Sequence, residues 1–150
     1  MYINLVKYLL HMKTANKEKL LKKVISAGDL VDKLLINELK IDRFNGEEKK
    51  QALRSENVDI MNVLELLKSE LQGRFDEELF LIQLKELKNV LEKQWDILEI
   101  VYENNGDESQ KAAVKAQQVN DGRVFYKNEM NRLFGTNIEF KNYETQKERR

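Results

Sequence analysis

Two stretches of this chain, residues 28–43 and 120–131, carry charged and amide side chains at helical spacing among apolar residues. Arginine and lysine in such positions could grip a carboxylate or a phosphate, and arginine does so most rigidly because its guanidinium is planar. Side chains of this kind either form a structural polar network or line a binding site, and the sequence leaves both alternatives open. The polar residues concerned are Asp29, Asp32, Lys33, Glu38, Lys40, Arg43, Asn120, Asp121, Arg123, Lys127 and Asn131.

In the first stretch, Asp29, Lys33 and Lys40 share one helical face because they are spaced by four and then seven residues. The alternative to a binding site there is a set of ion pairs within the helix, such as Asp29 with Lys33. Exposed pairs of that kind contribute only about 0.3–0.5 kcal/mol each. They would therefore be a modest surface feature.

The second stretch places Asn120, Lys127 and Asn131 on one stripe, at positions i, i+7 and i+11. Asparagine is a mediocre helix former, so its repeated use on one stripe indicates hydrogen-bonding partners. Gly122, inside the same expected helix, costs about 1 kcal/mol relative to alanine. Close approach of another backbone or of a ligand would explain this glycine, and so would a tight crossing of two helices.

A third candidate is the segment from Trp95 to Glu99. Trp95 adjoins an apolar stripe, so we expect a core position with the indole N–H bound to an acceptor. Asp96 and Glu99 could hold a divalent ion with acidic residues of the preceding helix, as in the all-helical nucleotide pyrophosphohydrolases. Those residues are Glu56 and Asp59. Acidic residues three apart are expected by chance at this charge density, so we predict no metal centre and no cofactor.

The composition excludes several kinds of active site. There is no cysteine and a single histidine, His11, so disulfides, thiolate chemistry and histidine-rich metal sites have no basis. The sequence lacks the motifs of phosphate loops, dinucleotide folds and nucleophile elbows. We assign no catalytic residue, and whether the protein is an enzyme stays open. The candidate ligand-binding residues are Asp32, Lys33, Glu38, Arg43, Trp95, Glu99, Asn120, Arg123, Lys127 and Asn131.

Long helices must position these residues, because the chain has no proline, only six glycines and abundant leucine, lysine and glutamate. Ser26 is the expected N-cap of the first helix, answered by Asp29 as in a capping box. Gly46 is expected to close that helix in a left-handed conformation. The apolar periodicity predicts helices over residues 26–44, 47–72, 76–103 and 108–134.

Two of these helices carry heptad seams, which favour shallow packing against neighbouring helices. Asn57 occupies a seam position of the second helix, where a polar residue is more typical of a register device than of a ligand contact. The second helix has the seam Leu53, Asn57, Ile60, Leu64, Leu67 and Leu71, and the third has Leu84, Leu87, Leu91, Gln94, Leu98 and Val101.

Four helices with short connections predict an all-α fold, an antiparallel up-down-up-down helical bundle with long helices. We expect the bundle over residues 26–143 and a charged tail over 144–150. Residues 1–25 are a basic N-terminal extension or an additional helix, and Met12 is an alternative start. The apolar run over residues 3–10 is too short to span a bilayer and lacks the features of a signal peptide. We therefore expect a cytoplasmic protein with no membrane span.

The three polar regions, in this order, resemble the motifs of a bacterial family of small helical proteins of unknown function. The first motif of that family reads Ser-x-Gly-Glu-Leu-Ile-Asp-Lys, and the last reads Asn-Asp-x-Arg followed by Lys and Asn at helical spacing. Asp29 replaces the usual glutamate, which keeps the carboxylate. The matching residues are Ser26, Gly28, Leu30, Asp32, Lys33, Ile36, Glu38, Lys40 and Arg43, then Leu87, Lys88, Leu91, Trp95, Asp96 and Glu99, then Asn120, Asp121, Arg123, Lys127, Asn131, Glu139, Lys141 and Tyr143.

This resemblance spans Ser26 to Tyr143, and the lysine-rich N-terminus and the charged extension depart from it. The family has no assigned activity, so the resemblance implies no reaction. It implies that the polar regions lie together, and we expect one interhelical polar cluster near one end of the bundle.

The charge balance bears on the partner. The 26 basic and 26 acidic residues cancel, which does not favour nucleic acid. The leading hypothesis is a non-enzymatic helical module that binds a second copy or a protein partner. The alternative is a small-anion-binding or metal-dependent enzyme site built from the same polar cluster.

Overall fold

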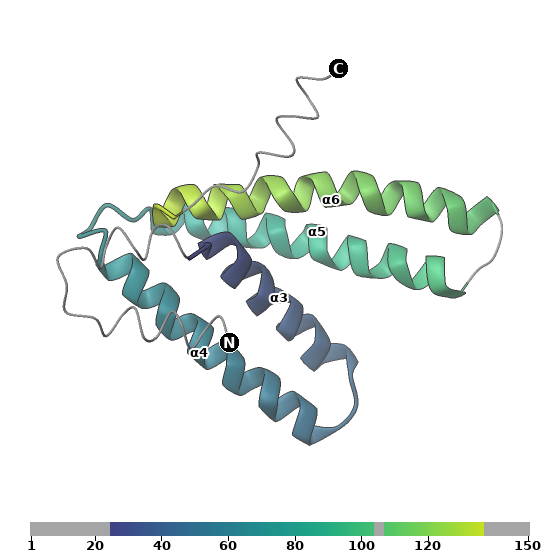
Figure 1. The fold of residues 1–150 in the computed structure, drawn as a ribbon, viewed down its shortest axis with the longest axis horizontal. Helices are drawn as coiled ribbons and strands as arrows, with labels where there is room; N and C mark the ends of the chain where they lie inside the picture. Colours follow the sequence, from purple (N-terminus) through teal and green to yellow (C-terminus); the bar gives the residue numbers. More distant parts are fainter. Residues whose placement is uncertain (1–24, 104–106, 137–150) are drawn as a thin grey trace, which may run out of the picture.

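The computed structural model describes residues 25–103 and 107–136, which contain four helices and no strand (Figure 1). The prediction of an all-α helical bundle is confirmed. Within this part of the chain, no helix combines the length and the apolar character needed to cross a membrane. The charged tail expected over 144–150 lies outside the described residues, and so does the N-terminal extension or additional helix expected over 1–25, except for its last residue. The helices are α3 (Ala27–Arg43), α4 (Glu47–Ser69), α5 (Glu77–Glu103) and α6 (Asp107–Phe134).

Helix α3 is the central element, because it packs against α4, α5 and α6. Helices α5 and α6 form a long antiparallel hairpin, and α4 packs mainly on α3. Successive helices run in opposite directions, and the hairpin projects past the C-terminal end of α3 (Figure 1). The far half of the hairpin therefore has no third helix over it within the described residues.

The core gathers around the N-terminal half of α3. Phe75 and Phe134 stack there with ring centroids 4.8 Å apart, beside Phe80. The buried apolar residues are Ile25, Ala27, Leu30, Val31, Leu34, Leu35, Leu39, Ile60, Val63, Leu64, Leu67, Leu87, Leu91, Met130 and Phe134.

The heptad seams are buried only where α3 covers them. In α4 the seam positions 57, 60, 64 and 67 are buried as expected. In α5, Leu87 and Leu91 are buried, but Leu98 is 37% exposed. Leu98 lies in the projecting half of the hairpin, so the apolar pattern continues there without a helix to bury it.

Local capping explains where α3 begins and ends. Ser26 is the N-cap as predicted, and its hydroxyl accepts a hydrogen bond from the N–H of Asp29 at 3.1 Å. The role predicted for Gly46 is wrong. Helix α3 ends at Phe44 in extended backbone, and Gly46, with φ of 110°, is instead the N-cap position of α4.

The other connections are short turns. Helix α4 ends at Ser69, earlier than predicted, because Gln72 and Gly73 turn the chain with φ of 50° and 86°. Asp76 caps α5 by accepting a hydrogen bond from the N–H of Leu79 at 3.0 Å. These caps fix the antiparallel return of α5.

Candidate functional site

A side chain of α6 holds the N-terminus of α3. Asn131 Oδ1 accepts hydrogen bonds from the Gly28 N–H at 2.8 Å, the Ser26 hydroxyl at 3.1 Å and the Thr136 hydroxyl at 2.8 Å. The Ala27 N–H donates to Thr136 Oγ1 at 3.1 Å. The first N–H groups of a helix have no acceptor within that helix. The partner expected for Asn131 is therefore the start of another helix. Thr136, which lies beyond the predicted end of the last helix, also contributes and was not among the candidates.

Gly28 permits this contact. A Cβ atom built on Gly28 would lie 2.2 Å from the carbonyl oxygen of Lys127, so α3 and α6 touch through their backbones here. The sequence reading looked for such an approach at Gly122, and that was wrong. A Cβ on Gly122 would meet the Val90 side chain at 3.7 Å, which is ordinary van der Waals contact.

One helical turn further along α3, Asp32 and Arg123 form a two-point ion pair. Arg123 Nε donates to Asp32 Oδ1 at 2.8 Å and Nη2 donates to Oδ2 at 2.7 Å, while Nη1 donates to Gln94 Oε1 at 3.1 Å. The Asp32 side chain is 8% exposed and that of Arg123 is 26% exposed. The pair thus joins α3, α5 and α6 in a setting that is partly shielded from water.

The hydrogen bond to Asp32 raises the pKa of the Arg123 guanidinium above its ordinary value, although burial alone would lower it. A raised pKa means that the folded state binds this proton more tightly than the unfolded chain. The stabilisation from Arg123 is therefore fully present at neutral pH and is lost only when the pH rises far into the alkaline range.

Two further charges of the first stretch, Asp29 and Lys33, also pair with residues of other helices. Lys127 Nζ lies 2.6 Å from Asp29 Oδ1, and Lys33 Nζ lies 3.7 Å from Glu56 Oε1. The expected pair of Asp29 with Lys33 within α3 is not formed, because the two side chains lean toward different neighbouring helices. These contacts tie α3 to α6 on one side and to α4 on the other.

Asn37 is a buried polar residue that the sequence reading missed. Its Nδ2 donates to Glu56 Oε1 and to Asn57 Oδ1, both at 2.9 Å. Asn57 in turn donates to the carbonyl of Leu34 at 3.4 Å. The available signal was an asparagine among the apolar residues of α3, the same signal that was used for Asn131. Asn57 therefore contacts another core amide, which fits a device that sets the register of α3 on α4.

A separate group closes the C-terminal end of α3. Arg43 Nη1 lies 2.9 Å from Asp96 Oδ1 and 3.6 Å from Glu99 Oε1, and its guanidinium lies over the Trp95 ring at 5.5 Å. The Trp95 indole N–H donates to Glu99 Oε1 at 2.8 Å, so the expected acceptor is present. Phe44 packs against Trp95 with centroids 6.1 Å apart.

The candidate residues therefore do not form the single cluster expected at one end of the bundle. Asp32, Arg123, Lys127 and Asn131 lie near the N-terminal half of α3, and Arg43, Trp95 and Glu99 lie at its other end. The reason is that the eleven positions from Asp32 to Arg43 span about 16 Å of helix. Lys33 pairs with Glu56 of α4, and Glu38 is exposed without a hydrogen bond or ion pair to any described residue. Asn120 Oδ1 accepts a 3.5 Å hydrogen bond from Gln94, which also accepts one from Arg123.

Acidic residues do not converge on a cation. Asp96 and Glu99 are held by Arg43, and Glu56 by Asn37 and Lys33. Within residues 25–103 and 107–136, no three acidic or histidine side chains lie close enough to hold a metal ion.

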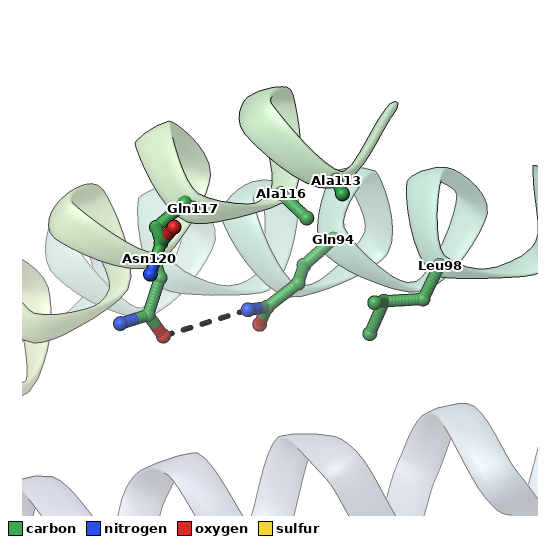
Figure 2. Close-up of a pocket in the computed structure, with 6 residues that line it drawn as sticks. All are labelled: Gln94, Leu98, Ala113, Ala116, Gln117 and Asn120. Carbon is green, nitrogen blue, oxygen red and sulfur yellow. Dashed lines mark hydrogen bonds between the residues drawn. The ribbon is translucent and has the colours of Figure 1, made fainter. Parts of the chain in front are cut away.

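One open pocket lies between α5 and α6, on the side of the hairpin that faces α3 (Figure 2). Its volume is about 310 Å³, near the lower limit of roughly 300–1,000 Å³ for small-molecule sites. The pocket is lined by amide and apolar side chains and has no charged side chain, so it cannot form an ion pair with a phosphate or a carboxylate. The lining residues are Gln94, Leu98, Ala113, Ala116, Gln117 and Asn120.

Comparison with known proteins adds no assignment. Family models, curated proteins and solved structures were each searched, and none matches this chain. The geometry described above is therefore the basis on which a function is argued.

Proposed function

We propose that this protein is a non-enzymatic helical binding module whose polar residues hold α3 on the α5–α6 hairpin. The observation that carries the proposal is the two-point pairing of Arg123 with Asp32. An anion site needs a cation whose donors are free to turn toward the ligand. Here Asp32 and Gln94 engage all three guanidinium nitrogens of Arg123.

The other candidate cations support the same interpretation, because each already has a carboxylate partner. Lys127 pairs with Asp29, Lys33 with Glu56, and Arg43 with Asp96 and Glu99. Charges removed from water are costly unless they are paired, so this is the arrangement that a structural network requires. Binding is then expected on helix faces that these charged residues do not occupy.

We also infer that the chain belongs to the bacterial family whose motifs it resembles, and that it works in the cytoplasm. Contacts between the first and last motifs support the family, since Gly28 and Asp32 meet Asn131 and Arg123. The absence of cysteine is compatible with a reducing compartment.

The test is a titration of the full chain with inorganic phosphate, and separately with Mg²⁺, followed by calorimetry and by thermal unfolding. We expect no saturable binding of either ion. Arg123→Ala should lower Tm by about 5–10 °C, because it leaves Asp32 buried and unpaired. The control Arg54→Ala removes an exposed arginine that pairs only with Glu47 at 3.5 Å, and should change Tm by no more than about 2 °C.

One result would replace this proposal with the alternative of an anion-binding or metal-dependent site. That result is saturable binding of phosphate or Mg²⁺ by the wild type, lost in an Arg123→Ala variant that keeps its helicity and its Tm.

A further inference from the structure

The projecting half of the hairpin presents a helix face without charge. Four of its residues follow the 3-4-3 spacing of one α6 stripe, and two come from the adjoining seam of α5. About a third of the whole chain (35%) is charged, so an uncharged face of this length is unusual for it. We call it the amide face, and its residues are Gln94, Leu98, Gln110, Ala113, Gln117 and Asn120.

The amide face is solvent-accessible in the described part of the chain. Gln110, Ala113, Gln117 and Asn120 are exposed, and Leu98 is a large apolar residue that no described helix covers. Figure 2 shows the amides of Gln94 and Asn120 joined by a hydrogen bond on the side of the hairpin that faces α3. The open pocket thus marks the place where the α5 seam passes out from under α3.

The outer face of α6 is a weaker candidate for an interface. It carries the exposed apolar residues Val114 and Phe125, but these lie eleven positions apart, or about 16 Å along the helix. Lys115 and Asp121 lie between them in the sequence. Isolated exposed apolar residues are normal on protein surfaces and need no partner.

We propose that the amide face is the contact surface between two copies of this chain, related by a two-fold axis that passes close to the pocket. This inference rests on the proposed function and names the partner of the binding module. A two-fold axis brings each side chain near its own counterpart, so charged side chains on the face would repel one another. Amides avoid this, because each carries both a donor and an acceptor and can bond to its own kind.

The apolar members of the face suit the same partner. Ala113 is small enough to let a second pair of helices approach closely, and Leu98 offers apolar area beside the pocket. The chain has no net charge, so two copies do not repel at long range. From Gln110 to Asn120 the face runs only about 15 Å along α6. Such an interface is at the small end of the known range, and we expect a dissociation constant on the order of 1–100 µM.

The experiment is sedimentation equilibrium of the full chain over a concentration series. The wild type should pass from monomer to dimer within the micromolar range. The double variant Ala113→Glu/Gln117→Glu places like charges across the axis and should weaken the dimer by about 100-fold. The matched control Val114→Glu/Gln118→Glu adds the same two charges at the residues that follow positions 113 and 117, which are exposed on the outer face of α6. The control should leave the dissociation constant of the dimer unchanged.

A mixing experiment makes the test independent of folding defects. Ala113→Glu/Gln117→Glu mixed with Ala113→Lys/Gln117→Lys should restore a heterodimer at least as strong as the wild-type dimer. The proposal is overturned if the wild type stays monomeric up to about 1 mM, well above the expected range. It is also overturned if the control weakens the dimer as much as the test variant, or if mixing restores nothing.

The lack of native cysteine allows another occupant to be recognised. Gln117→Cys and Gln118→Cys each create a single thiol in the full chain. If a monomeric chain protects position 117 but not position 118 from thiol reagents, another segment of the same chain covers the face and the proposal is wrong.

The phosphate titration and the sedimentation experiment test different proposals. If the chain is monomeric and binds no phosphate, the dimer proposal fails and the proposed binding module must have another partner. If the chain dimerises and binds phosphate through Arg123, the proposed function fails and the dimer interface stands.

Discussion

The two ends of the α5–α6 hairpin use polar side chains in opposite ways. Near the end of α6, Asn131 and Arg123 are occupied by groups of α3, and Gly28 lets the two backbones touch. Towards the far end, Gln117 and Asn120 are exposed beside an open pocket. Amide and charged residues at helical spacing look alike in the sequence at both ends. What separates them is whether a third helix lies over the hairpin.

This comparison explains why polarity was a poor guide to a binding site. Charged residues were the first candidates, yet the four cations among the candidate ligand-binding residues each pair with a carboxylate of a neighbouring helix. The exposed polar groups beside the pocket are uncharged amides. Asn120 was one of the candidates, and Gln117 was not a candidate. A closed polar contact stabilises the fold, whereas an open one is available to a partner.

The largest effect is expected from closing the gap that Gly28 leaves. Gly28→Ala should lower the free energy of unfolding by about 3 kcal/mol or more, because a Cβ would lie 2.2 Å from a backbone carbonyl that has no room to give way. Helix α3 would have to move off α6 and lose its hydrogen bond to Asn131. Urea denaturation measures this. A loss below about 1 kcal/mol would mean that the contact between α3 and α6 is looser than described.

Removing Arg123 weakens the same contact between α3 and α6, because it leaves the Asp32 carboxylate without its partner. Arg123→Ala should cost about 2–3 kcal/mol, less than for a fully buried pair because the guanidinium is partly exposed. The double variant Arg123→Leu/Asp32→Leu removes both charges and should recover most of that loss. If the double variant is no more stable than Arg123→Ala, the penalty does not come from an unpaired Asp32. Equilibrium denaturation of the two single variants and the double variant decides this.

Asn131 tests which atom of the amide matters. Asn131→Ala leaves the Gly28 N–H and two hydroxyl groups without their acceptor and should cost about 2 kcal/mol. Asn131→Asp keeps an acceptor at the start of α3, where negative charge is favourable. It gives up only Nδ2, which has no hydrogen-bond partner among the described residues. We expect Asn131→Asp to be clearly more stable than Asn131→Ala in thermal unfolding at pH 7, and the reverse order would contradict the assigned orientation.

The smallest effect has the opposite sign. Gly122→Ala should raise the free energy of unfolding by about 0.5–1 kcal/mol, because alanine favours the helix and the new methyl meets only the Val90 side chain at ordinary distance. Gly28→Ala and Gly122→Ala make the same substitution at two helix contacts, that of α3 with α6 and that of α5 with α6, and the expected effects on stability are opposite. Destabilisation by Gly122→Ala would show that α5 and α6 pack more tightly than the geometry indicates.

The helices and most of their ends could be predicted from the amino-acid sequence, because they depend on residues within one or two turns of each other. The spacing of apolar positions such as Ile60 and Leu64, the Ser26 cap and the lack of proline were sufficient to predict an all-α bundle. It also indicated correctly that Asn131 and Trp95 need hydrogen-bonding partners, since an amide or an indole N–H in an apolar setting is costly when unpaired.

Which side chains meet depends on how the helices pack. Asp29 pairs with Lys127 rather than Lys33, and Gly28 rather than Gly122 is the point of close approach, because both depend on where α3 crosses α6. The exposure of Leu98 was equally hidden, since its heptad position is the same as that of the buried Leu91. Helical periodicity tells which side chains share a face. The length and crossing point of the neighbouring helix tell whether that face is covered, and neither is encoded in the local pattern.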